Sequence, residues 1–223
     1  YVARAVRSHQ LAGEHHFAPR RRLDWALAYA GVRRAEPDLS EFVTWLDPEV
    51  PVWFNDPEGA VRSFAELEER SLQATVDYRI EWGEGAGPWR LKVGGLYRAA
   101  EREAAGQGFQ IQAYDWSTAD PRWQLPPEEF FDGRFATEAD ANFLLSRVLA
   151  GGRYGARERI AAAYGMLEVP LGTQVRLIGG ARVEHTALVV DAENNLGQPS
   201  RSAPTYTDLL PSAIVTLDLT DRQ

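Results

Sequence analysis

The sequence contains no cysteine, a single methionine and no long apolar run, and these absences exclude several classes of protein. Without cysteine, the chain has no disulfide framework and no thiolate metal site. A transmembrane helix needs roughly 18 or more consecutive apolar residues, and no stretch approaches that length. The mean hydropathy of −0.36 also argues against membrane-spanning helices. Membrane crossing by β-strands stays open, because only every second residue of a barrel strand faces lipid.

Basic charge is scarce as well. The chain has 24 Lys and Arg against 32 Asp and Glu, for a net charge of −8. Nucleic acid is bound through clustered Lys and Arg, so we expect no nucleic-acid partner. The chain opens on Tyr1-Val2-Ala3-Arg4 without an initiator Met or a signal peptide, which predicts an interior segment of a longer protein.

The sequence does contain long runs in which apolar and polar residues alternate, the pattern of a strand with two different faces. From Leu72 to Trp82, every even position is apolar or aromatic and every odd position is polar. A turn at 83–88 follows, and the alternation resumes at Trp89. This predicts a β-hairpin.

Two further hairpins have the same design. One surrounds a turn at 18–21, and the other a turn near Pro170 and Gly172. In the third hairpin, Ile160, Ala162, Tyr164 and Met166 are expected on the apolar face. A seventh strand is expected from about Leu210 to Leu219.

The connections predict how these strands are arranged. Long polar segments at 33–70, 103–156 and 186–208 alternate with the short turns. Outer-membrane barrels combine tight periplasmic turns with long extracellular loops, and their strands need about 9 to 11 residues to cross the membrane. We therefore expect an all-β fold over residues 1–223: a segment of an antiparallel up-and-down transmembrane β-barrel with about seven long strands.

The two faces have different expected environments. Aromatic residues such as Phe17, Trp25, Trp82 and Trp89 fall near the short turns, as in the interfacial girdle of a barrel. The polar face, which suits a wet lumen, carries Asp77, Arg79, Glu81, Arg90, Lys92, Arg98, Arg159, Arg176, Arg182 and Glu184. The alternative is a soluble β-barrel that encloses a small ligand against an inward apolar face.

The chain also resembles the barrel domain of TonB-dependent outer-membrane receptors over nearly its whole length. The resemblance is carried by the order and spacing of Glu36-Pro37-Asp38, Arg62-Ser63-Phe64, Glu66-Leu67, Lys92 to Arg98, Glu101-Arg102, Pro126 to Glu129, Ala163 to Met166, Val169-Pro170-Leu171, Gly179-Gly180, Arg182-Val183-Glu184 and Asp208 to Ser212.

The resemblance implies a function and a location. Such receptors lie in the outer membrane of Gram-negative bacteria and import a ferric siderophore, a vitamin or an oligosaccharide with energy from the TonB complex. Their barrels have about 22 strands and hold an N-terminal plug domain. We expect this chain to be about a third of such a wall. Its partners would be membrane lipid, a small-molecule ligand and TonB, the last through a plug domain that the sequence lacks.

Aromatic residues in the long connections are the candidate ligand-binding groups, since exposed rings need a packing or binding partner. They either form small loop cores or stack on a ligand. The candidates are Trp45, Trp53, Phe54, Trp116 and Trp123, together with the inward-facing Arg176 and Arg182, which could instead contact the plug. Short helices are expected at 126–131 and 137–149.

Catalytic signatures do not stand out. No Gly-x-Ser-x-Gly elbow occurs, and Gly151-Gly152 lacks the Lys-Ser/Thr of a phosphate loop. The four histidines lack zinc-ligand spacing, and His15 and His16 project to opposite faces of a strand. We therefore expect no enzyme, no metal and no cofactor.

Overall fold

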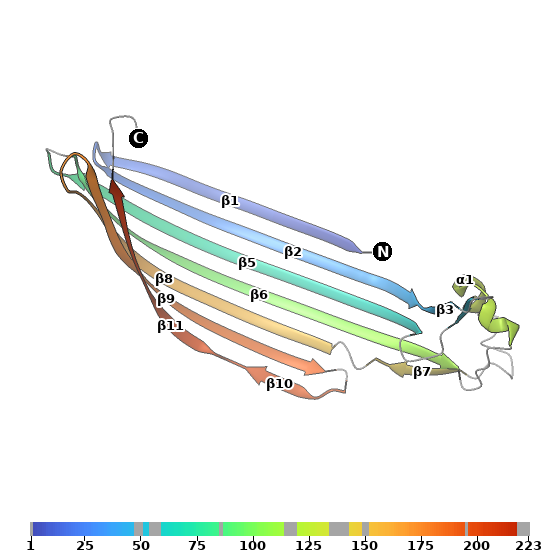
Figure 1. Cartoon of the computed structure of the whole chain (residues 1–223). Helices are drawn as coiled ribbons and strands as arrows, with labels where there is room; N and C mark the ends of the chain where they lie inside the picture. Colours follow the sequence, from blue (N-terminus) through green and yellow to red (C-terminus); the bar gives the residue numbers. More distant parts are fainter. Residues whose placement is uncertain are drawn as a thin grey trace.

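The computed structural model describes residues 2–46, 51–53, 59–84, 87–113, 120–133, 143–148, 152–194 and 196–217, apart from the side chains of Leu46, Pro51, Trp53 and Phe143. Seven long strands run side by side in one sheet (Figure 1). They are β1 (Ala3–Ala18), β2 (Arg21–Phe42), β5 (Ala60–Trp82), β6 (Trp89–Ala113), β8 (Gly152–Pro170), β9 (Val175–Asn194) and β11 (Thr205–Leu217).

Every pairing between neighbouring strands is antiparallel, in the order β1-β2-β5-β6-β8-β9, with β11 beside β9. Two short strands extend the sheet: β7 (Phe143–Arg147) pairs with β6, and β10 (Pro199–Ser202) pairs with β9. The three tight turns lie where the alternation predicted them, after Ala18, Trp82 and Pro170. The predicted antiparallel, up-and-down order is confirmed.

The long polar connections were predicted wrongly in length. Strand β2 continues to Phe42, β5 begins at Ala60, β6 continues to Ala113, β8 begins at Gly152, and β9 continues to Asn194. The strands therefore reach 25 residues in β6, more than twice what a membrane crossing needs. In these outer portions apolar and polar residues occur on both faces, as in Leu188-Val189-Val190 of β9, so the period-two signal disappears although the backbone stays extended. Strand β11 likewise begins five residues earlier than expected.

The strand register assigns every side chain to one of two faces, because directly paired residues share a face. Trp25, Val76 and Gly95 form one such row, and Leu23, Tyr78 and Val93 form the next. On β5 this face is apolar or aromatic from Trp82 to Leu72 and charged from Arg70 to Glu66. Those eleven residues rise about 33 Å along the strand, or about 24 Å at a 45° tilt, which matches the apolar band of a membrane barrel.

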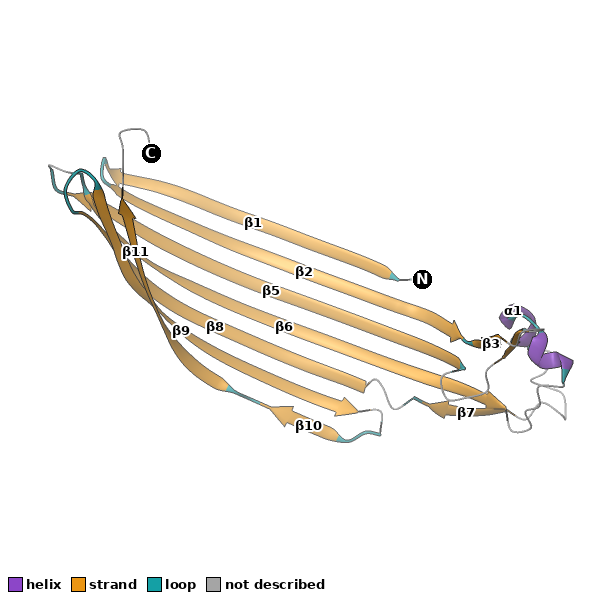
Figure 2. Cartoon of the chain, viewed as in Figure 1, coloured by secondary structure: helices purple, strands orange, loops and turns teal. Residues whose placement is uncertain are grey.

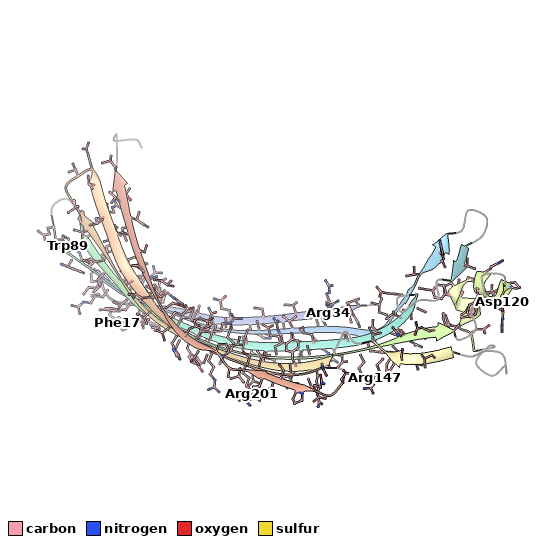
Figure 3. The ribbon with its side chains drawn as sticks, turned by 60° about the horizontal axis from the view of Figure 1, so that its bottom comes forward. Phe17, Arg34, Trp89, Asp120, Arg147 and Arg201 are labelled. Atoms are coloured by element: carbon pink, nitrogen blue, oxygen red, sulfur yellow. The ribbon has the colours of Figure 1, made fainter. Side chains whose placement is uncertain are left out.

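The curvature of the sheet shows which face points inward. Figure 3 shows a trough in which Arg34 projects into the concave side while Phe17 and Trp89 lie on the convex side. Arg34 shares its face with the polar row of Arg22, Arg79 and Lys92. The convex face is thus the apolar one. This is the opposite of the soluble barrel with an inward apolar face.

Strand β8 departs from the predicted faces. Ile160, Tyr164 and Met166 pair with Arg98, Gly94 and Lys92, so they lie on the concave side. Arg159 pairs with Ala99 and Ala187 on the convex side, although it was predicted among the polar lumen residues. Since β8 alternates Ala and Gly with larger residues, neither of its faces is strongly apolar, and the pattern could not settle which one faces outward.

A small cluster of short elements lies beyond the ends of β2 and β6, opposite the tight turns (Figure 2). It contains the β3–β4 hairpin (Thr44–Leu46 and Pro51–Trp53), the 3-10 helix η1 (Pro121–Gln124) and the four-residue helix α1 (Pro127–Phe130). Helix α1 confirms the helix expected at 126–131, whereas β7 occupies part of the segment expected as a second helix. Within the residues placed by the structure, no helix has the length and apolar character to cross a membrane.

Candidate functional site

Four aromatic residues from the connections and from the end of β2 belong to one packed group with apolar neighbours. We call this group the loop cluster: Phe42, Val52, Ala60, Ile111, Ala113, Trp123, Leu125, Phe130 and Phe131. Trp123 and Phe130 are almost fully buried, with ring centroids 5.0 Å apart. Phe131 meets both Phe130 and Phe42 edge to face. The loops therefore have a small core of their own.

Asp120 begins η1 and organises the approach to this cluster. Its side chain accepts hydrogen bonds from the Arg122 backbone N–H at 2.9 Å and from the Arg122 guanidinium at 2.6 and 2.8 Å. The guanidinium contacts are the main reason that the pKa of Asp120 lies below its usual value. A capped turn of this kind stabilises the segment that presents Trp123 to the cluster.

The predicted binding aromatics fall into different environments. Trp123 takes the packing role that the sequence left open for the loop aromatics. Trp45 lies on β3 with 57% of its surface exposed. The backbone of Trp53 lies on β4, paired with Thr44, while its side chain, Phe54 and Trp116 lie outside the described residues.

At the opposite end of the sheet, next to the tight turns, charged side chains of both signs crowd the concave face. We call this group the concave ionic band: Glu14, Arg22, Asp24, Asp77, Arg79, Glu81, Arg90, Lys92, Glu168, Arg176, Arg182 and Glu184. The members come from β1, β2, β5, β6, β8 and β9, so residues far apart in the sequence form a continuous polar surface.

The centre of the band is a contact that crosses three strands. The Tyr164 hydroxyl on β8 donates a hydrogen bond to Asp77 on β5, passing over Gly94 on the intervening strand β6. A Cβ at position 94 would come within 2.6 Å of the Tyr164 ring and 2.3 Å of the Asp77 carboxylate. Lys92 completes the group, with Nζ 3.2 Å from Asp77 and 5.4 Å from the centre of the Tyr164 ring.

Sequence reasoning placed Asp77 and Lys92 on the polar face but missed Tyr164, which it assigned to the other one. The pair Gly94-Gly95 interrupts an otherwise regular strand and was the one local sign that a side chain of a neighbouring strand comes close there. Glycine in a strand interior often marks the close approach of a neighbour.

The predicted Arg176 lies on the concave face within a chain of ion pairs. Glu168 accepts from Arg90 at 2.7 Å and lies 3.4 Å from Arg176, and Arg90 also contacts Glu81 at 3.2 Å. Two arginines thus share one half-buried carboxylate. Removing Glu168 would leave both cations facing each other.

The predicted Arg182 shares this face and donates to Glu184 two residues along the same strand, at 2.5 and 3.0 Å. Arg79, between Arg22 and Lys92 in its row, has no ion pair or hydrogen bond with any residue that the structure describes. The band therefore keeps one cation available for an anionic partner.

The structure does not bring the predicted residues into one site. Trp45, Trp53 and Trp123 lie at the long-connection end, whereas Arg176 and Arg182 lie near the tight turns. The concave face joins these two ends. Among the described residues, no group of three or more His, Asp or Glu side chains is placed to hold a metal ion.

Fold and faces together define a curved wall segment of an up-and-down barrel, with an apolar outer face and a charged inner one. Several solved structures are similar to it. The unliganded ferric citrate transporter FecA matches with a TM-score of 0.58 and 13% identity, over 99% of this chain and 26% of that chain. The siderophore receptor PiuA from Acinetobacter baumannii matches with a TM-score of 0.58 and 9% identity, over 98% of this chain and 30% of that chain.

These likenesses establish the fold, a wall segment of an up-and-down β-barrel. The chain spans less than a third of either structure. The sequence itself matches no protein-family model and no curated protein.

Proposed function

We propose that this chain forms part of the wall of a TonB-dependent receptor in the outer membrane of a Gram-negative bacterium, and that the receptor imports a ferric complex. The observation that carries the proposal is the division of the sheet into an apolar convex face, about 24 Å tall, and a charged concave face. Such a wall separates lipid from a wet passage. The similar structures are those of a ferric citrate transporter and a siderophore receptor, which favours an iron-bearing ligand over a vitamin or an oligosaccharide.

Two parts of the wall would have different roles. Trp45, with Trp53, Phe54 and Trp116 as further candidates, would contact the ligand at the outer end. Trp123 would hold the loop cluster together. The concave ionic band, including Arg176 and Arg182, would face whatever occupies the passage near the tight turns, which we expect to be a plug domain that couples the receptor to TonB.

The function is tested by an uptake assay in cells that carry the intact protein. The probes are ferric citrate and a ferric catecholate, both prepared with radioactive iron. We expect uptake that stops when an uncoupler collapses the proton gradient. Trp45→Ala should weaken binding about tenfold, as for an aromatic anchor, while Trp45→Phe should stay near wild type because it keeps a ring.

Each part of the proposal has a result that would contradict it. Uptake that persists with the uncoupler would contradict TonB-type energy coupling. Unchanged affinity in Trp45→Ala would remove that residue from the ligand site, and failure to bind either ferric complex would exclude the iron ligand.

A further inference from the structure

A hollow of about 270 Å³ lies on the convex face, at the upper limit of the apolar band. Its floor is Tyr29, Leu72, Tyr97 and Ala99, and its far rim carries Arg70, Arg157 and Arg159. We call it the arginine hollow. Neither the loop cluster nor the concave ionic band includes any of these residues.

The register explains why the hollow forms. Leu72, Ala99 and Arg159 occupy one row across β5, β6 and β8, and Arg70, Glu101 and Arg157 occupy the next row outward. The small side chain of Ala99 leaves space between its larger neighbours. The surface therefore changes from apolar to cationic within a single step along the strands.

The arginines of the hollow are incompletely engaged. Arg159 has no ion pair or hydrogen bond with any described residue, and it is exposed. Arg157 comes no nearer than 3.6 Å to Glu101, with both side chains more than 70% exposed. Arg70 is held by Glu68 at 2.6 Å. Glu101 and Glu158 are the acidic residues that line the hollow, and Glu158 lies 3.4 Å from Arg98. The guanidinium groups of Arg157 and Arg159 therefore keep most of their donors available.

We propose that the arginine hollow binds the anionic, phosphate-bearing headgroup of a lipid in the outer leaflet, in preference to a zwitterionic headgroup. Guanidinium groups pair with phosphate through two parallel hydrogen bonds, and tyrosine rings favour the boundary between hydrocarbon and water. The acyl chains would lie along the apolar rows below Leu72. The inference rests on the proposed function only for the membrane orientation of the sheet, and it needs no particular transported ligand.

Native mass spectrometry of the intact protein in detergent tests this, with phosphatidylglycerol and phosphatidylcholine of identical acyl chains as probes. The test variant is the double change Arg157→Gln and Arg159→Gln. A matched control is Arg153→Gln with Arg201→Gln, which removes the same charge from the convex face outside the hollow, where Glu193 and Asp191 hold these arginines. The heat-modifiable gel mobility of folded barrels checks folding, and Arg159→Gln alone is the milder variant.

We expect the test variant to bind phosphatidylglycerol about tenfold more weakly, the control to stay within about twofold, and phosphatidylcholine to bind weakly throughout. Equal losses in both double variants would overturn the proposal in favour of bulk charge. Equal affinity for the two lipids would also overturn it, and so would displacement of the lipid by inorganic phosphate at equal concentration. Ferric citrate uptake, measured in parallel, separates the outcomes, because lipid binding can persist where the transport proposal fails.

Discussion

Gly94 shows how one missing side chain organises the inner wall. The Tyr164 ring occupies the space above it and reaches Asp77 two strands away. An aromatic ring laid over a neighbouring glycine also covers backbone that would otherwise be open. The contact therefore ties three strands together at a single level of the barrel.

Gly94→Ala should destabilise the folded sheet by about 1 to 3 kcal/mol, because the new methyl group collides with the ring and the carboxylate. Urea unfolding, followed by heat-modifiable gel mobility, measures the change. Gly179→Ala is the matched control, since a Cβ there meets nothing within 4 Å. Equal stability of the two variants would mean that the Tyr164 ring moves aside at no cost.

The face on which a side chain lies could be predicted only where the two faces of its strand differ strongly in polarity. Trp82, Arg176 and Arg182 were assigned correctly because their strands alternate strongly. Arg159 was assigned to the wrong face because the alanines on both sides of its strand give no contrast. The Trp123–Phe130 packing could be expected only as one of two roles, since two connections meet to bury those rings.

Among the elements, β2 and β5 illustrate how the strands continue outside the apolar band. Strand β2 holds a bulge between Glu36 and Leu39, at Pro37, which has no N–H to give to the ladder. The bulge presents Asp38 to Arg62 on β5, with two hydrogen bonds of 2.7 and 2.8 Å. The sequence motif Glu36-Pro37-Asp38 was expected after the strand, whereas it lies within it.

Acidic pH should weaken the pairing between the outer portions of β2 and β5. The hydrogen bonds from Arg62 lower the pKa of Asp38, so the folded state binds its proton less readily than the unfolded chain does. The stabilisation is therefore present above about pH 4 and is lost as the pH falls through the lowered pKa. Because both side chains are exposed, we expect a small effect.

Hydrogen exchange of the outer β2 and β5 amides, in wild type and in Asp38→Asn, measures this effect of pH on the strand pairing. The variant should exchange faster at neutral pH, and the two proteins should converge in acid. A difference that persists in acid after Asp38 is protonated would assign the effect to the bulge rather than to the ion pair.

For the whole molecule, the decisive property is which face meets lipid. The absence of cysteine makes single-cysteine labelling direct. Thr75 and Val76 are adjacent on β5, on the concave and convex faces respectively. In the membrane-embedded protein, Thr75→Cys should react with a water-soluble maleimide, and Val76→Cys only with a lipid-soluble one. The reverse pattern would indicate the soluble barrel with an apolar interior.

The strands continue well beyond the apolar band, and this extra length separates the loop cluster from the concave ionic band. Strand β5 continues twelve residues outward from Leu72 to Ala60, which is about 40 Å along the strand. A ligand captured beside the loop cluster is therefore still far from the concave ionic band. On β5 the concave face between them carries the neutral residues Ser71, Gln73 and Thr75, and Glu69 follows further outward, in an ion pair with Arg102 of β6. In the proposed receptor, a ligand bound beside the loop cluster would therefore have to leave it before the concave ionic band could hold it.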